Sequence, residues 1–442
     1  MSPLAKTRFR SSNNTSSRRR SLLFVMVGCA AVVFIVSLQP QQQRKSKVFY
    51  QVSSHWRKPN ESDVKNSSAA IPSLDHNNLA SKVDGTLWTS VKVNRNSAPP
   101  GVGNCQPRTN LMFLKIHKCA SSTAQRIFLR YGKKHKLTQV LPLTGNYLGA
   151  PPPFKSAMIP RSLRTPDNTY NMMVVHTRLH TPELEKVMKP DAKWVTIVRE
   201  PVAQFLSLWS YFDLKKFYSK SLEEFAKLPY EKVVRWRYAR VYGIHQMFYD
   251  LGYGSAEEYG EKEMTAVLQR LNQTFHLVML AERFDESLVL LKDLMCWRTE
   301  DVAYLSINSL VRPIDSATTV TNTTRAGILR LSKPDVQIYD FFSRVFQERV
   351  EQFGVERMAQ EVQLLRQANQ NLTQLCTVDR DDPRLYKEQM NWPKQVKPLP
   401  VRGDIPECID MAKTELSFLD DVRSIQRVWS KKGWPHLVQL DT

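Results

Sequence analysis

The chain contains 442 residues, 42% of them hydrophobic, which is enough to bury the core of one large or two ordinary domains. Its formal net charge is +21, and six of the positive charges lie in residues 1–20, where no acidic residue occurs. The surplus of about +15 in the rest of the chain suits a protein that handles anionic partners. No zinc-finger, RNP or basic-zipper pattern occurs, so we expect no nucleic-acid partner.

Residues 21–38 form an uncharged apolar run that is just long enough to span a bilayer as a helix. Arginines lie directly before the run, and the positive-inside rule keeps such an end in the cytoplasm. A cleaved signal peptide is the alternative, but the run is long for one and residues 37–40 make a poor cleavage site. We expect a cytoplasmic tail at 1–20, a transmembrane signal anchor at 21–38 and a single-pass type II topology.

Residues 39–104 are rich in serine, asparagine, glutamine, lysine and proline, and they show no sustained hydrophobic period. This composition is typical of a flexible lumenal stem, with a loosely packed subdomain as the alternative. The globular lumenal domain is then expected at 105–442. N-glycosylation sequons, which matter only in a secretory compartment, occur at Asn60, Asn66, Asn272, Asn322 and Asn371.

Five cysteines follow the anchor, at Cys105, Cys119, Cys296, Cys376 and Cys408. An oxidising lumen favours disulfide bonds, but an odd number leaves at least one thiol without a partner. The spacing of the five fits neither a zinc site nor a redox pair, and it does not decide how they pair.

The segment 110–132 is the first strand–loop–helix unit of the domain. The apolar run 111–116 is long enough for a buried strand and too short for a helix. Small and hydroxylated residues then follow Lys118, and a helical apolar stripe continues to Gly132, which should act as the C-cap. The free N–H groups and the dipole of a helix N-terminus favour an anion. The segment therefore predicts a phosphate-binding loop, with an ordinary capped turn and a surface lysine as the alternative.

This loop is not a Walker A loop, because no G-x-x-x-x-G-K-[ST] sequence occurs in the chain. Its order of lysine, small residues and Ser/Thr resembles the 5′-phosphosulfate loop of sulfotransferases that use 3′-phosphoadenylyl sulfate (PAPS). More closely, LKIHKCASST at 114–123 resembles the corresponding loop of the galactose 3-O-sulfotransferase family. Related loops commonly carry threonine where Cys119 stands, so we expect this cysteine to be the unpaired one. The residues of this loop expected to bind the donor are Lys115, Lys118, Ser121, Ser122 and Thr123.

A second buried strand is expected at 170–175, and it runs into His176 and His180. Their spacing matches that of a zinc-binding helix, but the preceding residues are strand-like and the glutamate of H-E-x-x-H is missing. We therefore expect no metal at this pair. In the family the strand likewise runs into a histidine-rich segment, so the resemblance implies that these histidines face the active centre.

A third strand is expected at 194–198, followed by a helix that begins at Pro201. Arg199 and Ser207 match the R-[DE]-P-x5-S signature by which sulfotransferases bind the 3′-phosphate of the donor. Arginine suits this task because its planar guanidinium binds phosphate oxygens in pairs. An R-E-P turn alone is common, but downstream of a lysine–Ser/Thr loop it is a specific signal.

Further segments complete an alternation of strands and helices. The basic, aromatic stretch 235–249 could stack on a sugar or an adenine, or could form an ordinary amphipathic helix. Residues 274–281 predict another strand, and Asp285 should cap the helix that follows. The alternation predicts an α/β fold with a P-loop-like, mostly parallel sheet flanked by helices, as in PAPS sulfotransferases. Ligands should bind at the carboxyl ends of the strands, where both phosphate motifs lie.

The sequence Asp379-Arg380-Asp381 has the DxD form of metal-dependent glycosyltransferases. It follows a predicted helix and precedes Pro383, not the end of a strand, so we do not expect it to bind a metal. The resemblance to the family covers about 105–430 and is absent from the tail, anchor and stem.

Together these features predict a Golgi membrane sulfotransferase that moves the sulfuryl group of PAPS to a sugar hydroxyl. The favoured acceptor is O3 of a terminal galactose on a glycolipid or a glycoprotein glycan. Lys118 would neutralise charge on the bridging oxygen, and residues 121–123 would hold the 5′-phosphate. Arg199 and Ser207 would hold the 3′-phosphate, and no metal is required.

His176 is the preferred general base, because an imidazole titrates near neutrality, with His117 and His180 in reserve. Three other functions stay open. One is a different carbohydrate sulfotransferase, such as a uronyl 2-O enzyme, and another is a non-catalytic Golgi glycan-binding protein on the same fold. The third is a nucleotide kinase, which the missing Walker A glycines disfavour.

Overall fold

The computed structural model describes residues 105–238, 242–254, 259–305, 309–310, 320–386, 396–397 and 399–434. All of them lie in one compact unit, Val83–Thr442. The predicted tail, anchor and stem, with Asn60 and Asn66, lie outside the described residues. No helix within the described part is long and apolar enough to cross a membrane.

A four-stranded parallel sheet forms the centre of this unit. Its strands are β1 (Leu111–Leu114), β2 (Met172–Met173), β3 (Lys193–Val198) and β4 (Leu277–Leu280), and their order across the sheet is β2-β1-β3-β4. Every strand residue except Lys193 at the start of β3 is buried, because a parallel sheet is covered on both faces. The prediction of a parallel α/β sheet flanked by helices is confirmed.

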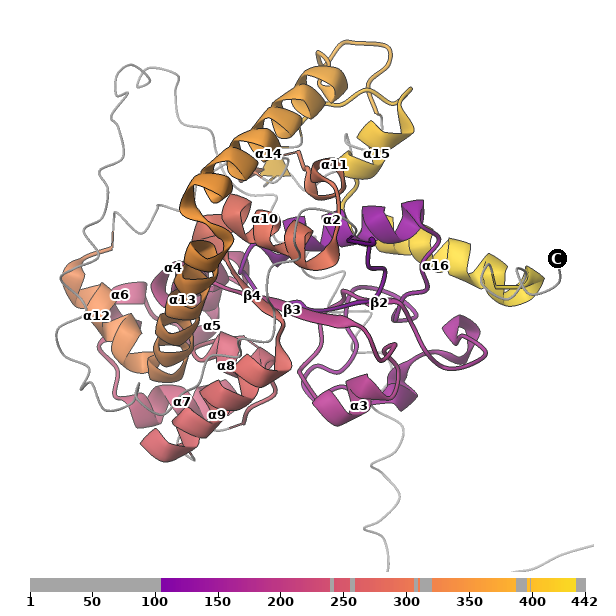
Figure 1. Ribbon diagram of the computed structural model, residues 1–442. Coiled ribbons are helices and arrows are strands. Elements are labelled where there is room, and N and C mark those ends of the chain that lie inside the picture. The colour runs from indigo at the N-terminus through magenta and orange to yellow at the C-terminus, as the bar shows by residue number, and fades with distance from the viewer. Residues whose placement is uncertain are drawn as a thin grey trace, which may run out of the picture. The chain divides into compact units, whose positions relative to one another are not determined.

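Helices pack on both faces of the sheet, and Figure 1 shows α2 and α10 on one side of the strands and α8 and α9 on the other. The helices are α2 (Ser121–Lys134), α3 (Thr181–Glu185), α4 (Pro201–Tyr211), α5 (Leu214–Tyr218), α6 (Leu222–Ala226), α7 (Tyr230–Tyr238), α8 (Gln246–Asp250), α9 (Glu261–Thr274), α10 (Phe284–Met295), α11 (Thr299–Val302), α12 (Asn322–Leu331), α13 (Lys333–Phe353), α14 (Val355–Cys376), α15 (Pro406–Ala412) and α16 (Glu415–Lys432). Short 3-10 helices occur at Ser156–Met158, Arg161–Leu163 and Ala281–Arg283, and β5 (Ser309–Leu310) pairs antiparallel with β6 (Val396–Lys397).

Two predicted helix caps are wrong. Gly132 lies inside α2, which continues to Lys134. A Cβ atom at this glycine would come within 2.6 Å of Gln139 Nε2 and 2.9 Å of Met172 Sδ, so glycine is needed for close packing and not for ending the helix. Asp285 lies in the first turn of α10, where it accepts hydrogen bonds from Tyr304 and Arg366, and the N-cap is Arg283.

The second predicted strand is shorter than expected. Only Met172–Met173 pairs as a regular strand, and the flanking residues Tyr170 and His176 form single bridges to Met188 and Tyr147. On either side of Met172–Met173, this segment therefore pairs with its neighbours only through isolated bridges. By contrast, β3 and the start of α4 at Pro201 agree with the prediction.

Two disulfide bonds cross-link the unit. Cys105–Cys296 joins the approach to β1 to the C-cap of α10, and Cys376–Cys408 joins the end of α14 to α15. Cys119 is buried and free of a disulfide, as expected.

The described sequons differ in exposure. Asn322 and Asn371 are exposed, and they remain predicted glycosylation sites. Asn272 is only 4% exposed on α9, so a glycan could be attached there only before α9 packs.

Asp379 and Asp381 lie exposed in the turn after α14. Among the described residues, no group of three His, Cys, Asp or Glu side chains is arranged to hold a metal ion.

Candidate active site

The loop between β1 and α2 has the backbone of an anion site. Lys118 and Ala120 have φ angles of 60° and 57°, a left-handed conformation that costs about 1–3 kcal/mol per non-glycine residue. Ala120 is the N-cap of α2 and supplies no side-chain cap, and the first turn contains no acidic residue. The first N–H groups of a 14-residue helix are therefore directed at a position that suits an anion.

The hydroxyls of this loop have different roles. Ser121 Oγ donates to the carbonyl of Ile116 at 2.7 Å, so this hydroxyl closes the loop. Ser121 can therefore offer a ligand its backbone N–H rather than its hydroxyl proton. Ser122 Oγ lies 3.5 Å from the Nζ of Lys115. Ser122 and Thr123 are partly exposed.

Lys118 lies with its ammonium 3.8 Å from the ring centroid of Tyr211, a cation–π contact. The pKa of Lys118 is lowered to about 8, mainly by burial and also by the positive charges of Arg199 and Lys115, while Glu415 acts in the opposite direction. An anion that binds beside this lysine would strongly stabilise its charged form.

Arg199 belongs to the same site, because β3 runs parallel to β1 and both strands end at this edge. Its Nη1 donates to the carbonyl of Lys118 at 3.0 Å, and its Nε lies 4.0 Å from Glu282 Oε1. Ser207 is buried on the second turn of α4, the helix that Arg199 precedes. The two predicted phosphate motifs are thus in direct contact through Arg199 and Lys118.

Lys115 is buried behind the loop, with 1% of its side chain exposed. Its Nζ lies 2.8 Å from Glu415 Oε2 and 3.1 Å from His176 Nε2. Burial lowers the pKa of Lys115, and Glu415 acts in the opposite direction. Glu415 also accepts from Asn146 at 2.8 Å, so α16 completes the back of the site.

His176 is buried, and both of its ring nitrogens face Lys115. Nδ1 lies 2.9 Å from the backbone carbonyl of Lys115, which can only accept, and Nε2 faces the ammonium, which can only donate. These partners assign the neutral ring with its proton on Nδ1. Burial, with help from the charge of Lys115, lowers the pKa of His176 well below its usual range. His180 is exposed at the N-cap of α3.

His117, the residue before Lys118, forms an Asp–His pair. Its Nδ1 lies 2.7 Å from Asp250 Oδ2, and its Nε2 lies 3.1 Å from the hydroxyl of Tyr147. Its ring stacks on that of His176, with centroids 4.1 Å apart. The carboxylate assigns a proton to Nδ1, and in the neutral ring Nε2 is then an acceptor, which is the arrangement of a general base oriented by a third group.

Sequence reasoning missed Asp250, Glu415 and Tyr147. Asp250 directly follows the aromatic stretch and Glu415 lies in the family-like C-terminal segment, but neither carries a spacing that marks a partner 133 or 300 residues away. Tyr147 stands in a loop of no recognisable pattern. Only the fold brings these side chains to the two histidines.

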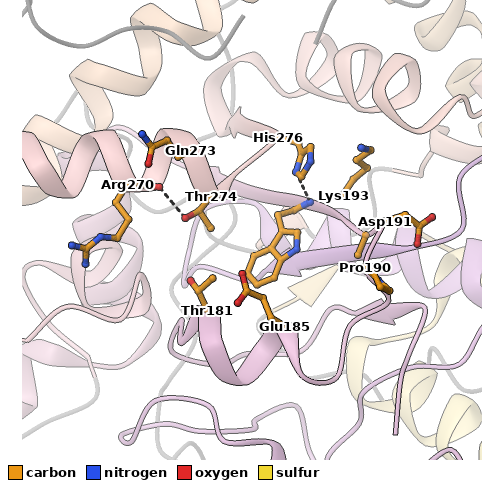
Figure 2. Close-up of a pocket in the computed structure, with 11 residues that line it drawn as sticks. Thr181, Glu185, Pro190, Asp191, Lys193, Arg270, Gln273, Thr274 and His276 are labelled. Atoms are coloured by element: carbon orange, nitrogen blue, oxygen red, sulfur yellow. Dashed lines mark hydrogen bonds between the residues drawn. The ribbon is translucent and has the colours of Figure 1, made fainter. Parts of the chain in front are cut away.

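A separate pocket of about 330 Å³ lies at the opposite, amino ends of β3 and β4 (Figure 2). Lys193 and His276, which begin or precede these strands, line it. Burial lowers the pKa of His276 to about 4, and its Nδ1 accepts from the backbone N–H of Trp194 at 3.1 Å. Another pocket, of about 530 Å³, adjoins Glu282 and therefore the Arg199 side of the site.

A parallel α/β sheet whose carboxyl edge carries an uncapped helix N-terminus, a lysine, an arginine and an Asp–His pair defines a phosphate-loop group-transfer enzyme. The sequence profile of a family described as galactose-3-O-sulfotransferase matches residues 10–403. The chain belongs to the galactose-3-O-sulfotransferase family. The match begins in the predicted tail, which the resemblance did not reach, and ends before Glu415.

Individual relatives agree with the family. The chain is 35% identical to bovine galactosylceramide sulfotransferase over 357 residues, which cover 76% of this chain and 83% of the relative. It is 32% identical to the human galactosylceramide sulfotransferase over 351 residues, covering 75% and 82%. It is also 32% identical to mouse galactose-3-O-sulfotransferase 3 over 315 residues, covering 68% and 71%.

Proposed function

We propose that this chain transfers the sulfuryl group of PAPS to O3 of a galactose on a glycolipid or a glycan. The observation that carries the proposal is the adjacency of three groups at one sheet edge. Lys118 and Arg199 share a hydrogen bond, and the Asp-paired His117 is the residue next to Lys118 in the chain. Family membership and the names of the relatives support both the reaction and the galactose acceptor.

The reaction is an in-line displacement at sulfur, in which the galactose hydroxyl attacks and the 3′,5′-bisphosphate leaves. The N-terminus of α2 and Ser122 would hold the 5′-phosphate, and Lys118 would neutralise charge on the bridging oxygen. Arg199 and Ser207 would hold the 3′-phosphate, and the pocket beside Glu282 offers room for the nucleoside. Arg199 is held by the carbonyl of Lys118, and Lys118 lies on the ring of Tyr211, which favours catalysis by positioning.

We propose His117 as the general base, in place of His176, which the sequence favoured. Nε2 of His117 is an acceptor, and Asp250 would stabilise the imidazolium that forms. His176 has both nitrogens engaged by Lys115, and a proton on its Nε2 would face an ammonium 3.1 Å away. His176 then serves as a neutral stacking partner for His117.

The proposed location is the Golgi membrane, with type II topology and the catalytic unit in the lumen. The apolar run at 21–38 with its preceding arginines supports this location. Two disulfide bonds and the exposed sequons at Asn322 and Asn371 also suit an oxidising secretory compartment. We propose that the reaction needs no metal, since cationic side chains stand at the positions where charge develops.

A panel of acceptors with sulfur-labelled PAPS tests the function. Galactosylceramide, a galactose-terminated oligosaccharide and a uronic-acid polysaccharide are compared, and the labelled position is determined on the product. Label on galactose O3 is expected, with no label in a Lys118→Ala control. Label on the uronic acid would indicate a 2-O enzyme, glycan binding without transfer would indicate a lectin, and phosphate transfer from ATP would indicate a kinase.

A further inference from the structure

The ring of His117 is almost entirely buried, and a tyrosine hydroxyl covers its proposed base nitrogen. The side chain of His117 is only 5% exposed, and the hydroxyl of Tyr147 lies on its Nε2 at 3.1 Å. Tyr147 itself is 40% exposed. A sugar hydroxyl that approaches this edge from solvent therefore meets Tyr147 before it meets His117.

Tyr147 is held firmly in this position. Its neighbours Asn146 and Leu148 exchange backbone hydrogen bonds with His176, at 2.9 and 2.8 Å, and its ring stacks on His176 with centroids 4.8 Å apart. Its hydroxyl also lies 3.2 Å from that of Tyr242, whose ring stacks on Phe212 at 3.6 Å. Swinging the Tyr147 hydroxyl away from Nε2 would break the ring stacking on His176 and the contact with Tyr242, so we expect Tyr147 to stay in place when the acceptor binds.

The hydrogen bonds among Asp250, His117, Tyr147 and Tyr242 leave one acceptor position on the Tyr147 oxygen. Asp250 can only accept, so His117 carries a proton on Nδ1, and in the neutral ring that a general base requires Nε2 accepts. Tyr147 therefore donates its single proton to Nε2, and its oxygen keeps two lone pairs. Tyr242 donates to one of these, and the other is available to a hydroxyl donor.

We propose that Tyr147 is a catalytic residue that receives the proton of the acceptor hydroxyl and passes its own proton to His117. The galactose oxygen bonds to sulfur as its proton moves to Tyr147 Oη, while the phenolic proton moves to His117 Nε2. The bond between sulfur and the 5′-phosphate oxygen breaks, and its electron pair leaves with the bisphosphate. Tyr147 is a neutral phenol before and after, and His117 ends as an imidazolium beside Asp250.

This assignment rests on the proposed function, and it explains why a phenol suits the position. Although the residue as a whole is half-exposed, burial of its hydroxyl end, together with Tyr242, raises the pKa of Tyr147 well above its usual range, so a lasting phenolate is disfavoured. A relay in which one proton arrives as another leaves avoids the phenolate. The opposing possibility is that Tyr147 merely occupies the place of the acceptor hydroxyl and is displaced by it.

A pair of phenylalanine variants separates the two possibilities. Tyr147→Phe removes the relaying oxygen, and the matched control Tyr242→Phe removes only the second hydroxyl of the chain. Single-turnover sulfation with saturating PAPS should fall about 10²-fold or more in Tyr147→Phe, as for loss of a positioned proton-transfer group. Tyr242→Phe should stay within a few-fold of wild type, and both variants should bind the bisphosphate product and the acceptor normally. A Tyr147→Phe rate equal to or above wild type would overturn the relay and support displacement.

A proton inventory provides a second measurement that a structural role would not affect. In mixtures of H₂O and D₂O, the wild-type and Tyr242→Phe rates should give a bowed curve, because two protons move in one step. A straight line for the wild type would overturn the relay even if Tyr147→Phe failed to fold. An inactive wild type would instead overturn the proposed function, whereas an active wild type with an insensitive Tyr147→Phe would overturn the relay alone.

Discussion

Asp250 accepts two hydrogen bonds from His117 on a single carboxylate oxygen, one from ring Nδ1 at 2.7 Å and one from the backbone N–H at 2.9 Å. The other oxygen accepts from Gln246 at 3.0 Å. Because side chain and main chain of His117 are fixed by the same carboxylate, the direction of Nε2 is tied to the phosphate loop that follows. The proposed base and the loop lysine therefore keep one relative position.

Replacements of His117 and His180 should differ sharply in their effect on turnover. His117→Ala should lower turnover by about 10²–10⁴-fold, the usual contribution of a positioned general base, and added imidazole should restore part of it. His180→Ala should behave as wild type, because His180 is exposed at the N-cap of α3. Turnover is measured at saturating PAPS and acceptor, and a fully active His117→Ala would contradict the assignment.

His176→Ala should act mainly on stability. Removing this ring leaves the buried ammonium of Lys115 without one acceptor, which should lower the free energy of unfolding by about 1–3 kcal/mol. Urea unfolding monitored by circular dichroism measures this change. A stable His176→Ala variant whose turnover is lost, and is rescued by imidazole, would restore His176 as the base.

Lys118→Ala should abolish transfer and leave folding intact, because the ammonium faces the donor position and a tyrosine ring, not the core. Lys216→Ala, on the exposed part of α5, is the matched control and should be fully active. Sulfation of galactosylceramide and the melting temperature are measured on the same preparations. Activity of Lys118→Ala within a few-fold of wild type would remove the lysine from the mechanism.

The pH dependence of donor use should show an alkaline limb near pH 8. Lys118 has its pKa lowered to about 8, so its positive charge is present below that pH and is lost above it. The value of kcat/KM for PAPS, which reports the free enzyme, should therefore fall as the pH rises through about 8. In Lys118→Arg, whatever its residual rate, the limb should disappear, since arginine stays charged. A limb unchanged by this substitution belongs to another group.

Removal of the two disulfides should have unequal costs. In the chain-entropy treatment, the 191-residue separation of Cys105 and Cys296 corresponds to about 5 kcal/mol, and the 32-residue separation of Cys376 and Cys408 to about 4 kcal/mol. The double serine variant of the first pair should therefore unfold at lower urea concentration than that of the second. The reverse order would show that local structure at α14 and α15 outweighs loop length.

The elements that sequence reasoning predicted are those whose signal is local. Apolar runs gave the three longer strands, and Pro201 gave the start of α4, because both depend on neighbouring residues. Gly132 was misassigned, because its need for glycine comes from Gln139 and Met172 packed against α2. The sequence also could not indicate which histidine is the better candidate for the general base, since that depends on which ring nitrogens are hydrogen-bonded in the fold.

The end of the family match has a practical consequence for anyone who expresses the catalytic unit. A protein trimmed at residue 403, where the profile match stops, would lack α15 and α16, and with them Cys408 and Glu415. Cys376 would become an unpaired thiol, and the buried ammonium of Lys115 would lose the carboxylate that lies 2.8 Å away. Such a truncation would retain every recognisable sequence motif and still be missing one wall of the proposed catalytic centre.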